Sequence, residues 1–441
     1  MASPIKKAGV SHPARWVPTL YFAEGMPFFA VSLIASILYK RMGVADDVNA
    51  LYTSWLLLPW SLKPLWSPLL EMFRTKKFFV VLFEFGGGLC LAMVPLCLRL
   101  PQYFPLTLAL FGVVAICSST HDIAADGLYI ASLSDKQQAA YAGWQGGFYN
   151  VARFFSQGGL LIVAGYLELR SGVPRAWMVI FAAMGGLLLA LSFWHSRVLP
   201  AGEPARRTET LPQAAATFRD VVATFFQKPR IWLLLSFIFL YRFAEGQTLK
   251  IGPLFLLAHR SAGGLGIPTD QVGLYNTVAS IAFIGGSVLG GYFTSWLGLR
   301  RSLLVLVCAM NFRMLAWVFL SSVMPSSYTA IGLALSADTF CYGFGFVGVI
   351  LLMMQEIAPG KYQTAHYAFA TALMNLGIIV PGLISGKLEV ALGYRIFFLC
   401  VLISGVPAVL LSRWIPVHAQ ERRTDDRFVS SVEQESEKAV K

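Results

Sequence analysis

The sequence predicts an all-α membrane protein, with twelve transmembrane helices arranged as two pseudo-symmetric bundles of six. Three observations lead to this fold class. The composition is 56% hydrophobic and only 13% charged, whereas a soluble domain carries about 25% charged residues. Apolar runs long enough to cross a bilayer, about 20 residues each, recur along the chain. Phrases from the first half of the sequence also return in the second half at a nearly constant offset.

Each apolar run is predicted to be a helix, because backbone groups in lipid must be hydrogen-bonded within the segment. The runs also lack the alternation of polar and apolar residues that a transmembrane barrel needs. Residues 1–15 lead into a full-length span without a cleavable signal pattern, so we expect the first helix to be its own anchor. The predicted spans are 16–39, 51–70, 78–98, 105–131, 139–166, 176–194, 231–258, 271–296, 302–322, 327–353, 363–389 and 395–414.

Lysine and arginine are distributed unequally over the segments that join these spans. With the N-terminus inside, the inner segments hold 22 of them and the outer loops hold 7. Because cytoplasmic loops are enriched in positive charge, both termini are expected in the cytoplasm. The net charge of +12 is then explained by topology and contact with membrane lipids, and no nucleic-acid partner is predicted. The six cysteines lie in or beside apolar runs without metal-ligand spacing, which indicates packing residues.

An internal repeat divides the chain at its longest internal polar stretch. The phrase FAEG at 22–25 returns at 243–246, and Gln138, Ala140 and Asn150 have counterparts 225 residues later in Gln363, Ala365 and Asn375. Such a duplication predicts two halves built on the same plan. We therefore expect a cytoplasmic tail at 1–15, a six-helix bundle at 16–194, a cytoplasmic connector at 195–230, a second bundle at 231–414 and a cytoplasmic tail at 415–441.

Two six-helix halves joined by a cytoplasmic loop resemble the major facilitator superfamily. The resemblance implies a cytoplasmic gate at the signature that follows helix two, although the usual leading Gly is missing and Glu replaces Asp. The second half retains a Gly and the basic end of the same signature. The gate residues that the resemblance implies are Glu71, Arg74, Lys76, Lys77, Gly290, Arg300 and Arg301.

A narrower resemblance is carried by LYFAEGMPFF in helix one, LPWSLKPLWSPLLE in helix two and THDIAADGLYIASL in helix four. These phrases look like those of the AmpG permease group, whose members import peptidoglycan breakdown products, and like the related RhtX/FptX siderophore importers. The resemblance implies a permease of the bacterial inner membrane that imports a polar small-molecule solute without a cofactor. A muropeptide is the leading substrate and a siderophore the alternative. The chain departs from the best-known AmpG pattern by its smaller number of predicted spans.

Charged side chains inside the predicted spans are candidates for function, because placing one at mid-bilayer costs about 2.5–3.5 kcal/mol on insertion scales. Asp122 and Asp126 stand one helical turn apart on helix four, so their carboxylates share a face and repel each other. We expect this pair either to carry protons or contact substrate, or to belong to a gate clamped by Arg153 or Lys136.

Glu24 and Glu245 are pseudo-equivalent residues of helices one and seven, which line the central cavity in this fold. Glu245 has Arg242 three residues before it and is expected to form an ion pair. Glu24 has no cation on its own helix, and an isolated buried carboxylate is a good proton carrier. An ion pair with Lys63 is the alternative for Glu24, and Lys63 could instead reach the inner surface.

Several further residues are expected in the cavity. Arg153, Arg242 and Arg313 present planar forks suited to the carboxylates of a substrate, and would equally suit a structural network. Trp144 and Tyr149 are expected to face the cavity, together with the symmetry mates Asn150 and Asn375. The glycine pairs 143/147 and 382/386 have the spacing of close helix contacts.

These features favour a secondary transporter that couples import to protons, works by alternating access and functions as a monomer. No GxxxxGK[ST] motif is present, so ATP is not expected to drive it directly. A membrane-embedded enzyme is disfavoured because HExxH and GxSxG are absent and the six histidines are scattered. A sensor that does not transport would have no need for cavity charges.

Overall fold

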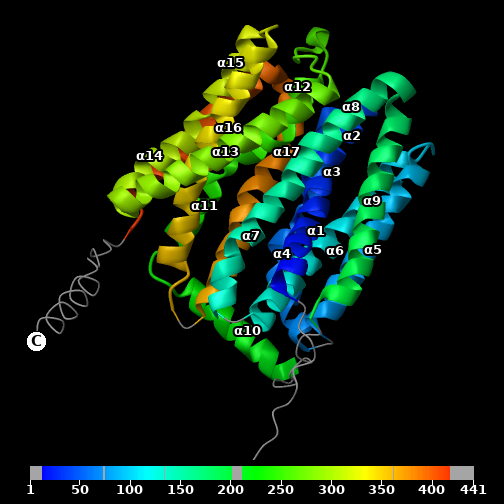
Figure 1. Cartoon of the computed structure of the whole chain (residues 1–441). Helices are drawn as coiled ribbons and strands as arrows, with labels where there is room; N and C mark the ends of the chain where they lie inside the picture. The colour runs from blue at the N-terminus through cyan, green and yellow to red at the C-terminus, as the bar shows by residue number, and fades with distance from the viewer. Residues whose placement is uncertain (1–11, 73–74, 134, 201–210, 361, 418–441) are drawn as a thin grey trace, which may run out of the picture.

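The computed structural model describes residues 12–72, 75–133, 135–200, 211–360 and 362–417, in which every regular element is a helix. Long helices lie side by side over most of the molecule (Figure 1). By length and composition, eight helices in these residues could cross a membrane, or nine if the bent pair Ala216–Phe226 and Ile231–Leu257 counts as one span. The architecture is that of an all-α membrane protein, as the sequence predicts.

The first half of the chain contains six rods, several of which are interrupted. The first rod begins with a short η1 segment and includes a π-helical segment, η2. The second and fifth rods are broken between α3 and α4 and around the π-helical η3. The elements are η1 (Pro13–Arg15), α1 (Val17–Phe29), η2 (Ala30–Ile34), α2 (Ala35–Arg41), α3 (Asp46–Trp55), α4 (Leu58–Met72), α5 (Lys76–Cys97), α6 (Tyr103–Ser132), α7 (Asp135–Arg153), η3 (Phe154–Gly159), α8 (Leu160–Ser171) and α9 (Val173–Val198).

The second half repeats this plan, and its last two predicted spans both lie within α17. Gly393 introduces a sharp turn between them, because its φ of 71° and ψ of 156° are not helical. Gly172, 221 residues earlier, makes the same turn between α8 and α9 with φ 79° and ψ 160°. The elements are α11 (Ile231–Tyr241), α12 (Phe243–Leu257), η4 (Arg260–Ala262), α13 (Thr269–Leu297), α14 (Leu299–Phe312), α15 (Leu315–Val323), α16 (Tyr328–Leu352), η5 (Met353–Ile357), α17 (Gln363–Ser404), α18 (Val406–Leu411) and η6 (Ser412–Trp414).

The polar stretch between the halves contains a helix of its own, α10 (Leu211–Phe226). The axis turns by 86° between residues 216–226 and the following helix, and α10 lies across one end of the bundle (Figure 1). We call this the connector end, and the end that carries loops 42–45 and 258–268 the far end. Lys228 ties the connector to η5 by donating to the carbonyl oxygens of Ile357 at 2.5 Å and Pro359 at 2.6 Å.

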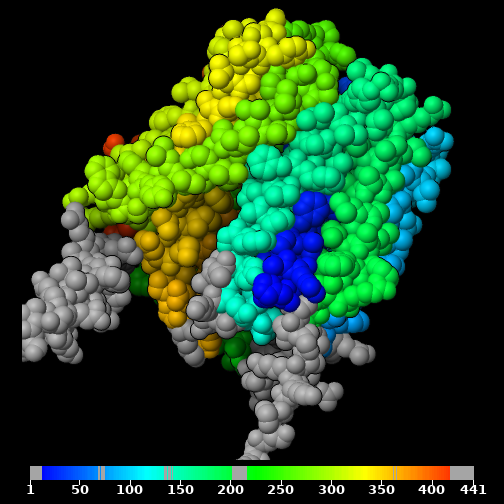
Figure 2. Space-filling view, in the orientation of Figure 1, coloured from blue at the N-terminus to red at the C-terminus, as the bar shows by residue number. Residues whose placement is uncertain are grey.

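The two halves lie against each other along a long seam, with blue to green residues on one side and lime to orange residues on the other (Figure 2). Glycines let the backbones approach. A Cβ on Gly386 would lie 2.5 Å from the Cα of Asp47, and one on Gly382 would lie 2.6 Å from the Oγ of Ser54. The expected role of this glycine pair in close packing is confirmed.

The other glycine pair behaves differently. A Cβ built on Gly143 or Gly147 meets no described atom within 4 Å, so the expectation of a close helix contact there is wrong. The pattern of small residues reports only that a close approach is possible. Whether it happens depends on which helix packs against that face.

Hydrogen bonds between the halves, in the part of the chain that the structure describes, lie away from α10. Thr269 donates to Glu168 at 2.9 Å, and Tyr394 donates to Asp46 at 2.5 Å. Further bonds between the halves join Lys40 to Tyr394, Asn276 to Gln157 and Lys250 to Thr53. The far end is therefore held closed by direct contacts between the halves.

Candidate functional site: a charged cavity between the halves

A cavity of about 480 Å³ lies between the two halves. Its walls are largely aromatic and apolar, with a small number of polar and charged side chains, which is typical of sites that bind small molecules. Residues from α1, η2, α4, α7, η3, α12, α13, α15, α16 and α17 contribute to it. The charged and amide side chains in the wall are Arg153, Arg242, Arg313, Glu245, Asp338, Asn150, Gln157, Asn276 and Asn375.

Arg242 and Glu245 form a two-pronged ion pair in this wall. The Nε of Arg242 donates to one oxygen of Glu245 at 2.8 Å, and Nη2 donates to the other at 2.6 Å. Nη2 also reaches the hydroxyl of Tyr342 at 3.2 Å, and the guanidinium lies 5.0 Å from the ring centroid of Phe346. Parallel bonds of this kind are the strongest arrangement for an arginine and a carboxylate. The ion pair predicted from the i, i+3 spacing is present.

Arg313 is neutralised in a second ion pair of the same half. Its Nη1 donates to Asp338 at 2.7 Å, and its guanidinium lies 4.8 Å from the ring centroid of Tyr342. Tyr342 therefore lies between the two ion pairs. Both pairs join side chains of the C-terminal half, so the charges that this half places in the cavity are matched within it.

Arg153 stands apart from the other two arginines. Its guanidinium lies 5.0 Å from the ring centroid of Phe283, across the seam between the halves. Tyr149, Tyr342 and Glu245 act on it electrostatically, yet no hydrogen bond or ion pair joins it to a described carboxylate. Among the described residues of the wall, Arg153 is the arginine left without an acidic partner.

Each of these arginines lies where a helix is interrupted. Arg153 ends α7 and is followed directly by the π-helical η3, Arg242 separates α11 from α12, and Arg313 follows the last residue of α14. Interruptions of this kind re-aim side chains and are frequent at functional sites. The sequence reasoning found the arginines by their charge, and the interruptions are the structural signal that it did not use.

A second charged cluster lies beside the cavity, in the N-terminal half. Lys63 and Asp122 form an ion pair. Asp126 accepts hydrogen bonds from the hydroxyl of Tyr21 at 3.1 Å and from the side-chain amide of Gln145 at 3.3 Å. Neither aspartate belongs to the cavity wall. We refer to these residues with Glu24 as the carboxylate cluster.

The expected partners of the two aspartates are not those in the structure. Arg153 does not clamp either carboxylate, because it lies over Phe283 in the cavity, and the side chain of Lys136 lies outside the described residues. Lys63 fills the role instead, so it neither pairs directly with Glu24 nor reaches the inner surface unpaired. Because Lys63 is 59 residues from Asp122, this pairing depends on how α4 and α6 are rotated.

Glu24 connects the cluster with the cavity. Its Oε2 is buried and has no hydrogen-bond partner among the described residues. Asp126 and Lys63 are its charged neighbours within the cluster, and Glu24 also acts electrostatically on Tyr149, a residue of the cavity wall. A buried carboxylate oxygen without a donor is costly, so Glu24 is the polar group of the cluster that the fold itself leaves unsatisfied.

Of the remaining residues expected in the cavity, three line its wall and one does not. Tyr149, Asn150 and Asn375 are in the wall. Trp144 is not, because its side chain is 45% exposed and its ring stacks on Phe148 with centroids 5.9 Å apart. Trp144 lies on a face of α7 that turns away from the cavity, and the position of a residue along a helix does not by itself give that face.

The expected gate residues of the first half are only partly described. The side chain of Glu71 and all of Arg74 lie outside the described residues. Lys76 and Lys77 begin α5, and Lys77 donates to the carbonyl oxygen of Leu199 at 2.9 Å. This contact ties the start of α5 to the end of α9. It is a bond within one half, so any role in a gate stays a prediction.

The matching residues of the second half are at the junction of α13 and α14. Gly290 packs closely on α16, because a Cβ there would lie 2.6 Å from the carbonyl oxygen of Phe344. Arg300 and Arg301 are exposed in the first turn of α14. Their exposure is compatible with the expected gate but does not test it.

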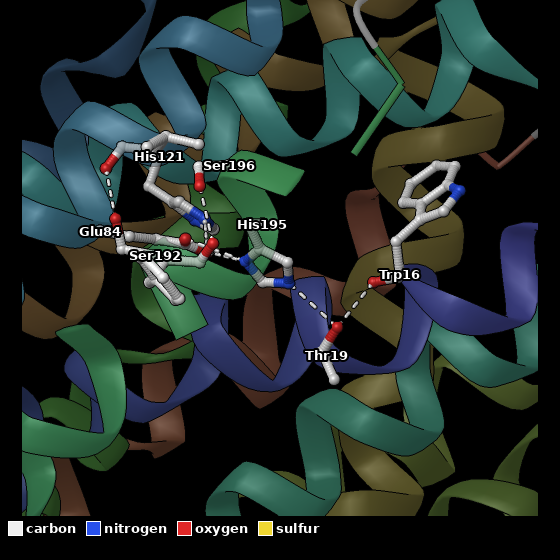
Figure 3. A network of polar contacts seen from close by, with 9 residues as sticks. Trp16, Thr19, Glu84, His121, Ser192, His195 and Ser196 are labelled. Atoms are coloured by element: carbon white, nitrogen blue, oxygen red, sulfur yellow. Dashed lines mark hydrogen bonds and ion pairs between the residues drawn. The ribbon is translucent and has the colours of Figure 1, made fainter. Parts of the chain in front are cut away.

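Sequence reasoning missed one buried network, shown in Figure 3. His195 Nδ1 lies 2.7 Å from Glu84 Oε1, and His121 Nε2 lies 3.0 Å from the same oxygen. Thr19 Oγ1 lies 2.9 Å from His195 Nε2 and is 3.2 Å from the carbonyl oxygen of Trp16, to which it donates. The histidines looked scattered in sequence because their positions on α6 and α9 are 74 residues apart, and only helix packing brings them to Glu84.

The hydrogen bonds of this network limit where the protons of His195 and Glu84 can lie. Thr19 gives its proton to Trp16, so His195 Nε2 must donate to Thr19. His195 Nδ1 faces both oxygens of Glu84. Either His195 is doubly protonated beside a carboxylate, or Glu84 carries the proton. In both cases the contacts of Glu84 with the two histidines, and of His195 with Thr19, join α1, α5, α6 and α9 within the N-terminal half.

Comparisons with known proteins agree with this architecture. A family model described as Major Facilitator Superfamily matches residues 19–365. The chain belongs to the major facilitator superfamily. Among solved structures, the nucleoside transporter NupG aligns with a TM-score of 0.66 at 13% identity, covering 90% of this chain and 98% of that one. A D-xylose-proton symporter aligns with a TM-score of 0.66 at 14% identity, covering 91% of this chain and 97% of that one. These likenesses show the fold.

Sequence relatives indicate a narrower group within the superfamily. The chain is 26% identical to the anhydromuropeptide permease of Escherichia coli K12, over 93% of this chain and 81% of the permease. It is 21% identical to a putative AmpG 3 transporter of Rickettsia typhi, over 78% of this chain and 81% of the relative. The AmpG-like resemblance seen in helices one, two and four is confirmed. The protein is a multi-pass membrane transporter of the secondary type and not an enzyme.

Proposed function

We propose that this permease imports a carboxylate-bearing sugar or peptide solute, such as a muropeptide breakdown product, together with protons. The substrate class is inferred from Arg153, whose guanidinium has no acidic partner among the described residues. The cavity holds three guanidinium groups, and two of them already have acidic partners. The third lies over Phe283 beside Tyr149 and Asn150, and a carboxylate on the solute would complete its hydrogen bonds.

The walls around Arg153 suit the rest of such a solute. Aromatic rings at Trp60, Tyr149 and Phe283 offer flat apolar faces for sugar rings, and Asn150 and Asn375 offer amides for hydroxyl or peptide groups. The relation to an anhydromuropeptide permease supports the same class. The siderophore alternative has no comparable support among these relatives.

Alternating access would follow from the seam between the halves. The described hydrogen bonds between halves gather toward the far end, which supports an inward-facing state in which the cavity is reached from the connector end. The bacterial homologue of Spinster, solved in an inward-facing and occupied conformation, aligns with a TM-score of 0.65 at 13% identity. The excess of Lys and Arg in the segments expected inside supports a cytoplasmic connector end and cytoplasmic termini in the inner membrane.

Proton coupling is assigned to the carboxylate cluster. Glu24, Asp122 and Asp126 are three acids gathered around Lys63, and acids in excess of cations at a buried site bind protons. Glu24 acts on both Asp126 and Tyr149, so a proton there alters the wall that contacts substrate. We propose a monomer, because each chain contains both halves and the whole cavity.

Uptake of labelled anhydromuropeptide into proteoliposomes tests the substrate assignment. Arg153→Ala should raise the half-saturation concentration by about 10–100-fold, the loss of one charge-assisted hydrogen-bonded contact of ~1.5–3 kcal/mol. A substrate whose carboxylates are amidated should lose the same factor with the wild type and little more with Arg153→Ala. Arg175→Ala, which removes an exposed arginine outside the cavity wall, is the matched control. If Arg153→Ala still discriminates fully between acid and amide, another residue binds the carboxylate.

A further inference from the structure

Lys250 is a buried cation that the transport proposal has not used. It lies in the middle of α12 and its residue is only 1% exposed. Its Nζ donates across the seam to the carbonyl oxygen of Thr53 at 2.9 Å and to the Oγ1 of Thr53 at 3.3 Å. No carboxylate in the described part of the chain forms an ion pair with it. A lysine so deeply buried normally requires an acidic partner.

The two oxygens that accept from Lys250 lie at the C-terminal end of α3, a helix of the other half. Thr53 is in the last turn of α3, which ends at Trp55, so its carbonyl group is one of those left free at a helix C-terminus. The negative end of the helix dipole favours a donor at that place. The Thr53 hydroxyl donates to Asn49 at 2.7 Å, which leaves its oxygen to accept from Lys250.

The structure gives the amine of Lys250 two acceptors, both on Thr53. A Cβ on Gly382 would lie 3.2 Å from the Cγ of Lys250 and 2.6 Å from the Oγ of Ser54, so α17 closes over the contact. A neutral amine has two N–H donors, and the two oxygens of Thr53 satisfy both. An ammonium group has three donors, and the third would have no described acceptor while the charge lay out of water.

The charged groups on the surrounding helices do not supply a counter-ion. Asp46 binds Lys40, and Glu245 binds Arg242. The remaining charged side chains that α2, α3, α13 and α17 carry toward the far end are Arg41, Asp47, Asp270, Lys387, Glu389 and Arg395. None of these groups forms an ion pair with Lys250 in the part of the chain that the structure describes. The charge state of this lysine therefore depends on whether the seam is closed.

We propose that Lys250 is a protonation-controlled latch between the halves, which is neutral while it binds the end of α3 and takes up a proton when the far end opens. This inference rests on the alternating access of the proposed function. Separation of the halves breaks the bonds to Thr53 and admits water to Nζ, which accepts a proton from that water. The proton returns to the same water before the seam closes. Acid on the far side thus favours the open far end.

The test measures conformation and needs no substrate. Spin labels at Arg170→Cys and Ser261→Cys, on the two halves at the far end, report opening by their distance distribution in a background with the six native cysteines replaced by serine. Glu24→Gln in the same background reduces the response of the carboxylate cluster. As the pH falls, the ratio of open to closed populations should rise by up to about tenfold per pH unit with Lys250 present.

Three variants decide the outcome. Lys250→Met should favour the closed population and remove most of this pH response, and Lys250→Arg should favour the open population at every pH. Lys387→Met, at an exposed lysine of the same half, should behave as the parent. An unchanged pH response in Lys250→Met, or a closed Lys250→Arg, would overturn the proposal. If Lys250→Met fails to fold, the comparison of Lys250→Arg with the parent still decides. Failure of anhydromuropeptide uptake by the wild type would instead count against the proposed function alone.

Discussion

Glu24 and Glu245 occupy equivalent places in the two halves, yet their surroundings differ. In the C-terminal half, Arg242 holds both oxygens of Glu245. The residue 221 positions before Arg242 is Tyr21, whose hydroxyl donates to Asp126 and not to Glu24. One substitution in a repeated phrase therefore separates a neutralised glutamate from one whose Oε2 has no described donor.

The difference extends to the charge balance of each half. Around the cavity, the C-terminal half matches Arg242 and Arg313 with one acid each. The N-terminal half separates its charges, with Arg153 in the cavity wall and the carboxylate cluster beside it. A half whose cavity charges are all paired can keep a fixed shape. A half with unpaired charges can pair them with a charged group of the solute or neutralise them with a proton. We propose from this comparison that the N-terminal half provides the charged groups that bind the solute's carboxylate and the proton.

The largest expected effect breaks the matched pair. Glu245→Gln should lower the free energy of unfolding by about 3–5 kcal/mol, because it leaves the buried guanidinium of Arg242 without its counter-charge. Glu24→Gln should change it far less, since Glu24 forms no ion pair in the structure. Denaturant unfolding in detergent, followed by tryptophan fluorescence, measures both. Equal losses in the two variants would show that the halves do not differ in this way.

A second experiment gives Glu24 the kind of arginine partner that Glu245 has in the C-terminal half. Tyr21→Arg places a guanidinium three residues before Glu24, in the spacing by which Arg242 holds Glu245. With Glu24 paired, accumulation of anhydromuropeptide driven by a pH gradient should fall about tenfold or more, which corresponds to at least ~1.4 kcal/mol of lost coupling. Counterflow of the same solute should persist.

Tyr21→Phe is the control for that experiment, because it removes only the hydroxyl that donates to Asp126. It should reduce accumulation less than Tyr21→Arg does. If Tyr21→Arg accumulates solute as the wild type does, Glu24 is not the coupling residue, and Asp126 becomes the next candidate within the cluster.

The sequence predicted those features that depend on local spacing. Apolar length placed the helices, since the hydrocarbon core sets how many residues a span needs. The repeated FAEG phrase identified the two glutamates, and the i, i+3 spacing gave the pair of Arg242 with Glu245. Charge inside an apolar run also identified Arg153 as a cavity candidate. Each of these follows from a single helix or from the repeat.

The features that were missed depend on how distant helices are rotated against each other. Lys63 and Asp122 are on α4 and α6, and Glu84 meets His121 and His195 across three helices. The 3.6-residue period gives the spacing of a face but not the helix that covers it. The wrong prediction for Trp144 has the same cause. Its position along α7 suggested a cavity residue, but its ring is exposed because it lies on another face of that helix.

The smallest expected effect concerns the glycine pairs, one in each half. Gly386→Ala should destabilise the closed seam by about 1–3 kcal/mol, because its Cβ would overlap the backbone of Asp47. Gly147→Ala meets no described atom and should change stability by no more than about 0.5 kcal/mol.

The spin-label distances across the far end and the unfolding free energy together separate the two effects of Gly386→Ala. An added methyl group at a fixed helix contact within one half would lower stability without moving the labels. Gly386 contacts the other half, so the substitution should also increase the open population, while Gly147→Ala leaves that population unchanged. A shift of the labels in Gly147→Ala would mean that the exposed face of α7 meets the other half in another state of the transporter, and the glycine pattern would then have a role in both halves.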